Sequence, residues 1–390
     1  MDTDRLKSTW AAAGEHADDV AAYFYAHLFV THPELREMFP LTMNAQRDRL
    51  VGALGRIVSS VDDLGQVVGF IEQLGRDHRR FSVVAEHYDA VGASLLWSLA
   101  HFLGDRWTTE VADDWAAAYG VVASTMIAAA EESEGVQPAY WEAEVLEKQR
   151  VSREIATFRI RTDQPYSYTA GQSMAVEIPQ VPRSWRFFTP ANAPREDGTI
   201  DLNAAVLAGG TVSGMFVGRV RPGDVLHLGA PIGTGLVLDP DDDADLVMVA
   251  GNTGLAPFLA LLDVITEQRR AGWPLRRVHV FHGVRFPWNL YANERLRRLA
   301  EQEWFTYTPV ISDDPTYPGR RGLVGDVATE HDFDGRYRVM LCGSPEMVRH
   351  AKAVFEKTPK PPESIEIEVY ADVPVTTATT ETAPAQGGQS

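Results

Sequence analysis

The segment Leu246–Pro257 reads LVMVAGNTGLAP and indicates the fold of the C-terminal part of the chain. Its first five residues form a continuous apolar run, which predicts a strand that is buried on both faces of a sheet. The glycines that follow predict a turn, and a helical pattern then runs from Pro257 to Arg270. A buried strand, a glycine turn and a helix in this order indicate one unit of a parallel α/β sheet.

The same alternation continues toward the C-terminus. We expect, in order, a strand at 277–281, a helix at 290–300, strands at 305–311 and 338–342, a helix at 345–355 and a strand at 365–370. This pattern predicts an α/β parallel-sheet domain over residues 244–372, with helices on both faces. Residues 373–390 are rich in Thr, Ala, Pro, Gly and Gln, and we expect them to form a disordered tail.

An acidic linker, Asp239–Asp245, precedes this domain, and the pattern upstream of it is different. Short β-rich runs are separated by turns that contain Gly and Pro; the runs lie at 151–161, 174–178, 200–207 and 225–228. Many short strands with turn signals between them predict an antiparallel β-barrel or sandwich. We expect an antiparallel β-barrel domain over residues 140–240.

The N-terminal third shows apolar residues at helical spacing and almost no strand signal. One stripe is Tyr88, Val91, Leu95, Leu99 and Phe102, and others start at Val67 and Val111. Such stripes are typical of amphipathic helices around a common core. The sequence therefore predicts an all-α domain over residues 1–136.

Composition and charge narrow the class of protein. The single cysteine, Cys342, excludes an intramolecular disulfide framework and any cluster that needs several cysteines. The 36 basic and 54 acidic residues give a net charge of −18, which argues against nucleic-acid and anionic-membrane binding. No apolar run is long enough for a bilayer span, and the first residues, MDTDRLKSTW, lack the pattern of a secretion signal. We expect a cytoplasmic protein.

The helical domain contains an informative histidine. His78 continues the apolar stripe of Val67, Ile71 and Leu74, so its ring is expected to face the core. A lone histidine there would be read as a satisfied core residue, but His78 occurs with a set of motifs in a fixed order. The set is Phe24-Tyr25 with Leu28-Phe29, Pro33-Glu34-Leu35 with Phe39, Gln46-Arg47, and His78 with Phe81. Over residues 4–132 this order resembles the globin domain of flavohaemoglobins.

The resemblance implies a role for each of these residues. His78 would be the proximal ligand of haem b iron, which takes a neutral imidazole and leaves its other face open to oxygen. The further residues implied at the haem are the distal Tyr25 and Gln46, Leu50 on the distal wall, Phe39 stacked on the haem, and Tyr88 as proximal support. Taken singly, Tyr25 and Tyr88 could equally fill core volume.

The family also has a glutamate next to the proximal histidine, and we assign that role to Glu131. Alignment on Asp114–Gly120 places Ala130 at this position instead, about 100° around the helix from Glu131. Either the end of the helix shifts to use Glu131, or the proximal histidine donates less electron density than in the family.

Two motifs in the expected barrel resemble the flavin site of ferredoxin-reductase-like flavoproteins. In Arg186-Phe187-Phe188-Thr189, the resemblance implies that Arg186 binds the FAD pyrophosphate, Phe188 stacks on the flavin and Thr189 reaches its N5 atom. A glycine-rich helix start binds phosphate through backbone amides, and this role falls to Gly209, Gly210, Val212 and Ser213. The alternative is an ordinary glycine turn with a serine cap. The family often has an aromatic residue where this chain has Ser173.

The α/β domain carries the motifs for the nicotinamide cofactor. The loop after the first strand resembles the family's G-x-x-G-h-x-P loop, and its residues are Gly251, Asn252, Thr253, Gly254, Leu255, Ala256 and Pro257. The resemblance places Cys342 and Gly343 at the nicotinamide pocket, and Tyr370 over the flavin. Cys342 could instead be a buried structural residue. Arg285, Arg320 and Arg321 could contact a 2′-phosphate or be solvated, so the sequence leaves NADH and NADPH open.

The three domains in this order imply electron flow from NADH or NADPH through FAD to haem. The resemblance implies a nitric oxide dioxygenase, whose small-molecule partners are O2, NO and the nicotinamide cofactor. Two alternatives stay open: an oxygen-binding or gas-sensing globin with its own reductase, and a reductase for another electron acceptor. We expect no nucleic acid, no stable membrane association, and a monomer or weak dimer.

Overall fold

The computed structural model describes residues 1–369 except 64, 66, 208, 234, 240–241, 273–275 and 334, together with the backbone of 377–378. The chain divides into two compact units, which are described separately. The first is Met1–Tyr140 with Pro182–Ser184, and the second is Trp141–Val181 with the chain from Trp185 onward. The expected β-barrel and α/β domains thus share the second unit.

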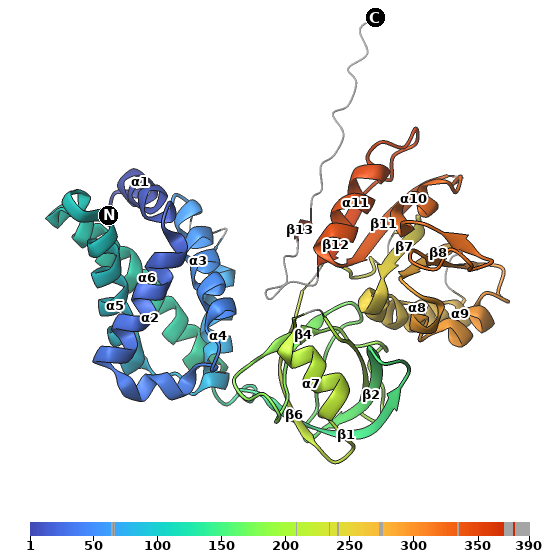
Figure 1. Ribbon diagram of the computed structural model, residues 1–390, viewed down its shortest axis with the longest axis horizontal. Helices are drawn as coiled ribbons and strands as arrows, with labels where there is room; N and C mark the ends of the chain where they lie inside the picture. Colours follow the sequence, from blue (N-terminus) through green and yellow to red (C-terminus); the bar gives the residue numbers. More distant parts are fainter. Residues whose placement is uncertain are drawn as a thin grey trace, which may run out of the picture. The chain divides into compact units, whose positions relative to one another are not determined.

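The first unit is all-helical, as predicted (Figure 1). Its elements are α1 (Thr3–Gly14), α2 (Ala17–Thr31), η1 (Pro33–Met38), α3 (Asn44–Ser59), α4 (Val68–His78), η3 (Arg79–Phe81), α5 (Ala85–Leu103), η4 (Gly104–Arg106) and α6 (Thr109–Ser133). Side-chain caps start two of these helices, because Asp2 accepts a bond from the Arg5 amide and Thr108 one from the Val111 amide. Among the described helices of the chain, none is long and apolar enough to cross a bilayer.

Helices α4 and α6 pack against each other at very close range. A Cβ atom at Gly75 would lie 2.2 Å from the carbonyl oxygen of Met126, so this approach requires glycine. Arg79, just past the end of α4, donates to the backbone and side-chain oxygens of Ser133, two turns beyond Met126 on α6. The C-terminal end of α4, which carries His78, is therefore fixed against the C-terminal end of α6.

The second unit begins with a six-stranded antiparallel barrel. Its elements are β1 (Trp141–Arg150), β2 (Ile155–Thr162), β3 (Ser173–Glu177), β4 (Arg186–Phe188), β5 (Thr199–Ala205), helix α7 (Thr211–Arg219) and β6 (Val225–Ile232). The strand order is β4-β3-β6-β1-β2-β5, and a bridge between Pro190 and Leu202 brings the two edges together. The barrel is therefore nearly closed, and Phe216 of α7 stacks on Phe158 inside it.

The structure corrects one predicted strand. The expected strand at 151–161 contains a turn at its start, because Ser152 Oγ accepts bonds from the amides of Glu154 and Ile155. This turn joins β1 to β2 as an antiparallel hairpin. The sequence gives no sign of this turn, because the β-rich run continues through Val151 and Ile155 on either side of it.

The rest of the second unit is a sheet with the order β10-β9-β8-β7-β11-β12-β13, parallel except at β13 (Figure 1). The strands are β7 (Asp245–Gly251), β8 (Val278–Val284), β9 (Phe305–Ile311), β10 (Arg320–Arg321), β11 (Tyr337–Gly343), β12 (Ile365–Val369) and β13 (Thr377–Ala378). The helical elements are η5 (Asn252–Leu255), α8 (Ala256–Arg270), η6 (Pro287–Asn289), α9 (Asn293–Leu299), α10 (Val324–Thr329) and α11 (Pro345–Phe355). The core divides into a layer under α8 and α9 and a layer under α10 and α11, so helices cover both faces, as predicted.

The strand order creates a crevice at one edge of this sheet. From the central β7 the chain proceeds to β8 and β9 on one side, and it later returns to β11 and β12 on the other. The carboxyl ends of β7 and β11 thus lie at a topological switch point, which is where open α/β sheets bind ligands.

Candidate active site

His78, at the C-terminal end of α4, is held in a form that can bind a metal ion. Its Nδ1 lies 2.6 Å from the carbonyl oxygen of Leu74. A carbonyl only accepts hydrogen bonds, so Nδ1 carries the proton and the lone pair of the neutral ring is on Nε2. Burial lowers the pKa of His78, which favours this neutral form. A neutral imidazole with a free Nε2 is the donor that haem iron requires.

The predicted distal residues come together around Tyr25 of α2. The Tyr25 hydroxyl donates a long bond, 3.4 Å, to the backbone oxygen of Gln46 at the start of α3. The Tyr25 ring meets Phe39 edge-on at 5.5 Å, and Leu50 packs against the same apolar cluster. Burial raises the pKa of Tyr25 to about 12, so this hydroxyl keeps its proton at neutral pH and can donate it in a hydrogen bond.

The two remaining residues predicted near His78, Tyr88 of α5 and Glu131 of α6, differ in their burial. Tyr88 packs against Val67, Ile71 and Met126, the same residues that Leu74 contacts. Glu131 is exposed, whereas Ala130 is partly buried on the α6 stretch that faces the end of α4. The Nδ1–H group of His78 donates its hydrogen bond to the Leu74 carbonyl oxygen, not to a carboxylate. Glu131 is therefore at the surface of this helix.

In the barrel, the motif at 186–189 lies on β4 and just beyond it. Phe188 meets the buried Phe216 edge-on at 4.9 Å, which fixes its ring at the barrel surface. Arg186 is half-buried, and one of its guanidinium nitrogens donates to the backbone oxygen of Trp185. Arg186 and Phe188 share one face of the strand, as their alternation predicts.

The glycine-rich loop before α7 is organised by Ser213. Its hydroxyl accepts a bond from the amide of Leu207 and donates to the carbonyl oxygen of Gly210, so it closes the loop. Gly209 has φ of +75°, which favours glycine. Val212 is buried in the barrel core and anchors the first turn of the helix. The loop thus ends at the N-terminus of α7, and helix N-termini are able to bind phosphate through their backbone amides.

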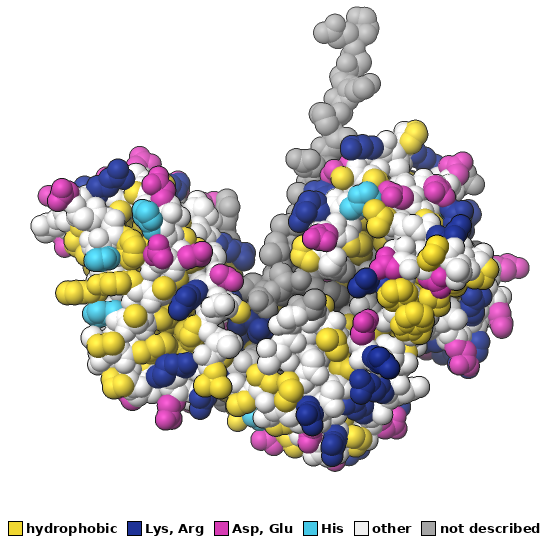
Figure 2. All heavy atoms as spheres, in the orientation of Figure 1, with side chains coloured by type: hydrophobic (Ala, Val, Ile, Leu, Met, Phe, Trp, Pro, Cys, Tyr) yellow, Lys and Arg dark blue, Asp and Glu magenta, His cyan; other side chains and the backbone are white. Residues whose placement is uncertain are grey.

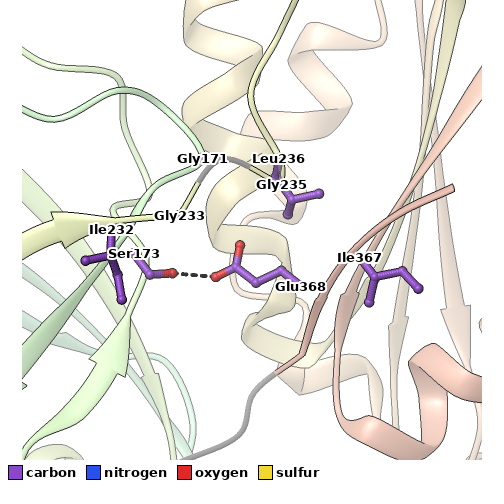
Figure 3. Close-up of a pocket in the computed structure, with 8 residues that line it drawn as sticks. All are labelled: Gly171, Ser173, Ile232, Gly233, Gly235, Leu236, Ile367 and Glu368. Carbon is purple, nitrogen blue, oxygen red and sulfur yellow. Dashed lines mark hydrogen bonds between the residues drawn. The ribbon is translucent and has the colours of Figure 1, made fainter. Parts of the chain in front are cut away.

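A pocket lies where the barrel meets β12, within the second unit (Figure 3). Its lining residues are Gly171, Ser173, Ile232, Gly233, Gly235, Leu236, Ile367 and Glu368. Glu368 points across the pocket and accepts bonds from Ser173 and, at 3.0 Å, from Thr189. Burial raises the pKa of Glu368, although the two hydroxyl donors oppose this effect.

Glu368 is a site residue that the sequence analysis missed. Its carboxyl contacts the Thr189 hydroxyl, which the motif assigns to the flavin, and its backbone pairs in register with Cys342 on β11. Ser173, which replaces the family's aromatic residue, is the second partner of this carboxyl. The flavin and nicotinamide motifs therefore meet through Glu368.

The loop after β7 has the close packing expected of a dinucleotide site. A Cβ atom at Gly254 would lie 2.2 Å from the carbonyl oxygen of Cys342, so η5 can contact β11 only through glycine. Asn252 adopts φ of +52°, and its backbone oxygen lies 2.9 Å from Nε2 of the buried His282. Burial lowers the pKa of His282 to about 4, so the ring is neutral and its Nε2 donates to Asn252. The side chains of Thr253, Leu255, Ala256 and Pro257 are buried behind the loop.

Cys342 and Gly343 end β11 beside this loop. Cys342 is fully buried, and the Cα of Gly251 would lie 3.2 Å from a Cβ atom at Gly343. The predicted pair therefore borders the loop, as the motif requires. Tyr370, the last predicted site residue, lies outside the described residues.

Comparison with protein families finds three domain models along the chain. "Globin" matches residues 22–126, "Oxidoreductase FAD-binding domain" matches 142–235 and "Oxidoreductase NAD-binding domain" matches 248–353. The flavohemoprotein of Bacillus subtilis is 25% identical and covers 94% of this chain and 95% of that protein. The flavohemoprotein of Bordetella pertussis is 29% identical over 85% of this chain and 84% of its own length.

The fold has a solved counterpart. The crystal structure of flavohemoglobin from Malassezia yamatoensis aligns with a TM-score of 0.74 and 17% identity, over 95% of this chain and 98% of that one. The fold and domain matches thus define a globin fused to a FAD- and NAD-binding oxidoreductase. The chain is similar to flavohemoproteins over most of its length, and the cofactors of its domains are haem, FAD and NADH or NADPH.

Proposed function

We propose that this protein is a nitric oxide dioxygenase, which oxidises NO to nitrate with O2 and takes the electrons from NADH or NADPH. The observation that carries the proposal is the state of His78. Its Nδ1–H is held by the Leu74 carbonyl and its neutral ring offers Nε2 to the iron. The similarity to flavohemoproteins over most of the chain supports the same activity.

Haem supplies the iron that binds O2, and FAD converts the hydride pair of NADH into single electrons. The chain's own residues hold and orient these groups. His78 is the iron ligand, and Tyr25 donates a hydrogen bond from a hydroxyl that stays protonated. Arg186 and the amides before α7 bind the FAD pyrophosphate, while Gly251–Leu255 bind the dinucleotide.

At the flavin edge, the Glu368 carboxyl is a group that can hold a proton next to Thr189. Glu368 Oε1 accepts from the Thr189 hydroxyl and from Ser173 Oγ, and burial raises the pKa of this carboxyl. Thr189 is thereby oriented by a group that can exchange a proton. Leu236 and Ile367 add apolar surface to the same pocket.

The test compares His78→Ala with His16→Ala. His16 is exposed and makes no side-chain cap bond, so its loss removes a histidine without touching the site. We expect His78→Ala to lose the Soret band and NO-dependent NADH oxidation, because the only proposed iron ligand is gone, while NADH still reduces the flavin. His16→Ala should behave as wild type. Unchanged NO turnover in His78→Ala would refute the assignment.

One observation favours a second function. The His78 Nδ1–H bonds a neutral carbonyl and Glu131 is exposed, so the ring receives less negative charge than a carboxylate partner would supply. A less electron-rich histidine suits reversible oxygen binding or gas sensing, with the reductase keeping the iron reduced. Slow NO turnover together with reversible O2 binding would select this function. A cytoplasmic location and a monomer or weak dimer remain predictions.

A further inference from the structure

The loop Gly251–Pro257, which follows β7, contains no cationic side chain for the phosphates of a dinucleotide. Over the drawn face of the second unit, acidic and basic side chains are intermingled (Figure 2). The loop itself can therefore bind phosphate only through backbone amides and the polar side chains of Asn252 and Thr253. An amide binds only when its N–H points at the ligand, so the orientation of each peptide group matters here. This inference rests on the proposed use of NADH or NADPH.

One peptide group of the loop is held by a histidine of the neighbouring strand. The backbone oxygen of Asn252 lies 2.9 Å from Nε2 of His282 on β8. A carbonyl only accepts hydrogen bonds, so Nε2 carries the proton and donates it. His282 pairs in register with Ala250, so its ring lies beside the start of the loop. This hydrogen bond directs the Asn252 carbonyl toward a buried ring.

The same hydrogen bond sets the direction of the next amide. The peptide bond between Asn252 and Thr253 is trans, and in a trans peptide the C=O and N–H groups point in opposite directions. Because the Asn252 carbonyl points toward His282, the N–H of Thr253 points away from that ring. Thr253 lies in the first turn of a helical segment, where amides lack an acceptor within the helix. Its N–H is therefore suited to an external acceptor.

The backbone of Asn252 has a conformation that needs support from its surroundings. Its φ of +52° is in the left-handed region, which is unfavourable for residues other than glycine. Two residues further on, Gly254 contacts β11 so closely that a Cβ atom would lie 2.2 Å from the carbonyl oxygen of Cys342. The loop is thus anchored to β8 at Asn252 and to β11 at Gly254, with the Thr253 amide between the two anchors.

Packing alone does not account for a histidine at position 282. The side chain is fully buried, and its Nδ1 has no hydrogen-bond partner among the described residues. Val278 and Val280 occupy the same face of β8, and an apolar side chain at 282 would avoid the cost of an unpaired buried nitrogen. Burial lowers the pKa of His282 to about 4, so the ring is neutral at physiological pH. The bond to Asn252 is thus the contact that uses the polarity of this ring.

The imidazole is also held from the side of the barrel. Tyr291 meets His282 edge-on, with ring centroids 5.8 Å apart. The Tyr291 hydroxyl accepts a bond of 3.3 Å from Asn203 Nδ2 on β5, a strand of the barrel. The ring that orients the loop is therefore itself fixed, by its own strand and by Tyr291.

We propose that His282 is a positioning residue for the nicotinamide dinucleotide: its Nε2–H holds the Asn252 carbonyl inward, which turns the Thr253 amide toward the cofactor phosphates. His282 acts through this peptide group and does not touch the cofactor. Without the hydrogen bond the peptide can turn over, and the phosphates lose an oriented donor. The effect is on cofactor binding and not on hydride transfer, which takes place at the nicotinamide end.

The test compares two replacements of His282 in the full-length protein with FAD bound. His282→Phe keeps a ring without a donor, whereas His282→Gln keeps an amide N–H close to the position of Nε2. We expect His282→Phe to raise the Kd for NAD⁺ and the KM for NADH about tenfold, the effect of losing one hydrogen bond. Its anaerobic rate of flavin reduction at saturating NADH should stay unchanged. His282→Gln should bind NAD⁺ nearly as wild type does, as measured by calorimetry.

His279→Phe is the matched control for the phenylalanine variant. His279 is also on β8 but on the opposite face, where its ring packs against Phe333. The control should keep the wild-type affinity for NAD⁺. Equal affinities in His282→Phe and His279→Phe, or an equal loss in His282→Phe and His282→Gln, would overturn the proposal.

A second variant keeps the test decisive if His282→Phe does not fold. His282→Asn places its amide near the position of Nδ1, out of reach of the Asn252 carbonyl, so it should bind NAD⁺ more weakly than His282→Gln. Equal binding by these two amide variants would overturn the role of Nε2. None of these measurements needs haem or NO, so failure of the dioxygenase function would be seen separately, as missing nitrate.

Discussion

Glu368 is the residue on which the reductase site converges. It contacts Thr189 and Ser173 of the barrel through its side chain and Cys342 of the parallel sheet through strand pairing. Because the folded-state pKa of Glu368 is raised above its ordinary value of 4.5, the folded protein binds this proton more tightly than the unfolded chain does. The contribution of Glu368 to stability is then complete at low pH and falls as the pH rises through the folded-state pKa.

Glu368→Gln tests this titration. Glutamine keeps an oxygen that can accept from Ser173 and Thr189 but cannot ionise, so the variant lacks the loss of stability that ionisation causes. We expect the unfolding midpoint of the variant, relative to wild type, to increase as the pH is raised from 5 to 8. Thermal unfolding of both proteins across this pH range measures the difference. A difference that does not vary with pH would show that the carboxyl does not titrate as described.

The sequence motifs include most of the residues that lie together in the candidate site. They do not include Glu368, and the reason is physical. Tyr25, Gln46 and Phe39 belong to local motifs, so their spacing carries the information. Glu368 stands in the run Ile-Glu-Ile-Glu-Val, where a polar residue every second position is typical of a solvated strand face. Only the packing of β12 against the barrel, which no local pattern encodes, places this carboxyl in a pocket.

At the scale of elements, the approach of η5 to β11 depends on Gly254. A methyl group there would meet the backbone of Cys342 at 2.2 Å, and backbone cannot move aside as a side chain can. We expect Gly254→Ala to destabilise the second unit by about 1–3 kcal/mol and to raise the KM for NADH, because the cofactor loop must shift.

Gly218→Ala is the matched control for this substitution. Gly218 lies in α7 of the same unit with no atom within 4 Å of its added Cβ, so the change should be neutral or stabilising by up to about 1 kcal/mol. Denaturant unfolding and NADH kinetics of the two variants give the comparison. Equal stability of Gly254→Ala and wild type would contradict the packing described for the loop.

The contact between α4 and α6 leads to a prediction about the partner of His78. Gly75 lies against Met126, and Arg79 is bonded to Ser133, so Ala130 lies on the part of α6 that runs beside His78. Ala130→Glu would place a carboxylate there as a competing acceptor for the Nδ1 proton. We expect a higher iron–histidine stretching frequency and a lower haem midpoint potential, since a charged partner makes the imidazole more basic.

Ala130→Gln controls for the added volume without the charge. It should leave the stretching frequency close to that of wild type. Resonance Raman spectra of the three reduced proteins provide the measurement. A wild-type frequency that already equals that of Ala130→Glu would show that His78 Nδ1–H donates to an anionic partner instead of the neutral Leu74 carbonyl.

The elements themselves were largely predictable. Runs such as 305–311 and 345–355 match β9 and α11 residue for residue, because buried strands and amphipathic helices carry their periods in the sequence. The hairpin between β1 and β2 was hidden, since the turn at Ser152 is made by a side-chain bond inside an otherwise strand-like run. Helix α10 is only six residues long, too short to show a helical period.

For the whole molecule, the proposed function requires that one chain carries electrons from NADH to a globin haem. The fold and domain matches supply the three modules, and the net charge of −18 is consistent with small-molecule substrates. Each NO needs one electron on its way to nitrate, and NADH supplies two. The complete protein should therefore form about two nitrate ions for each NADH that NO consumes.

An absorption experiment on the purified full-length protein tests this claim most directly. The spectrum is recorded as isolated, after anaerobic NADH, and then with NO in air while NADH and nitrate are followed. We expect a Soret band with a flavin shoulder, reduction of both chromophores by NADH, and NO-dependent loss of NADH with formation of the corresponding amount of nitrate. A flavin spectrum without a Soret band after haem is supplied would contradict the haem site, and haem reduction without nitrate formation would contradict the dioxygenase.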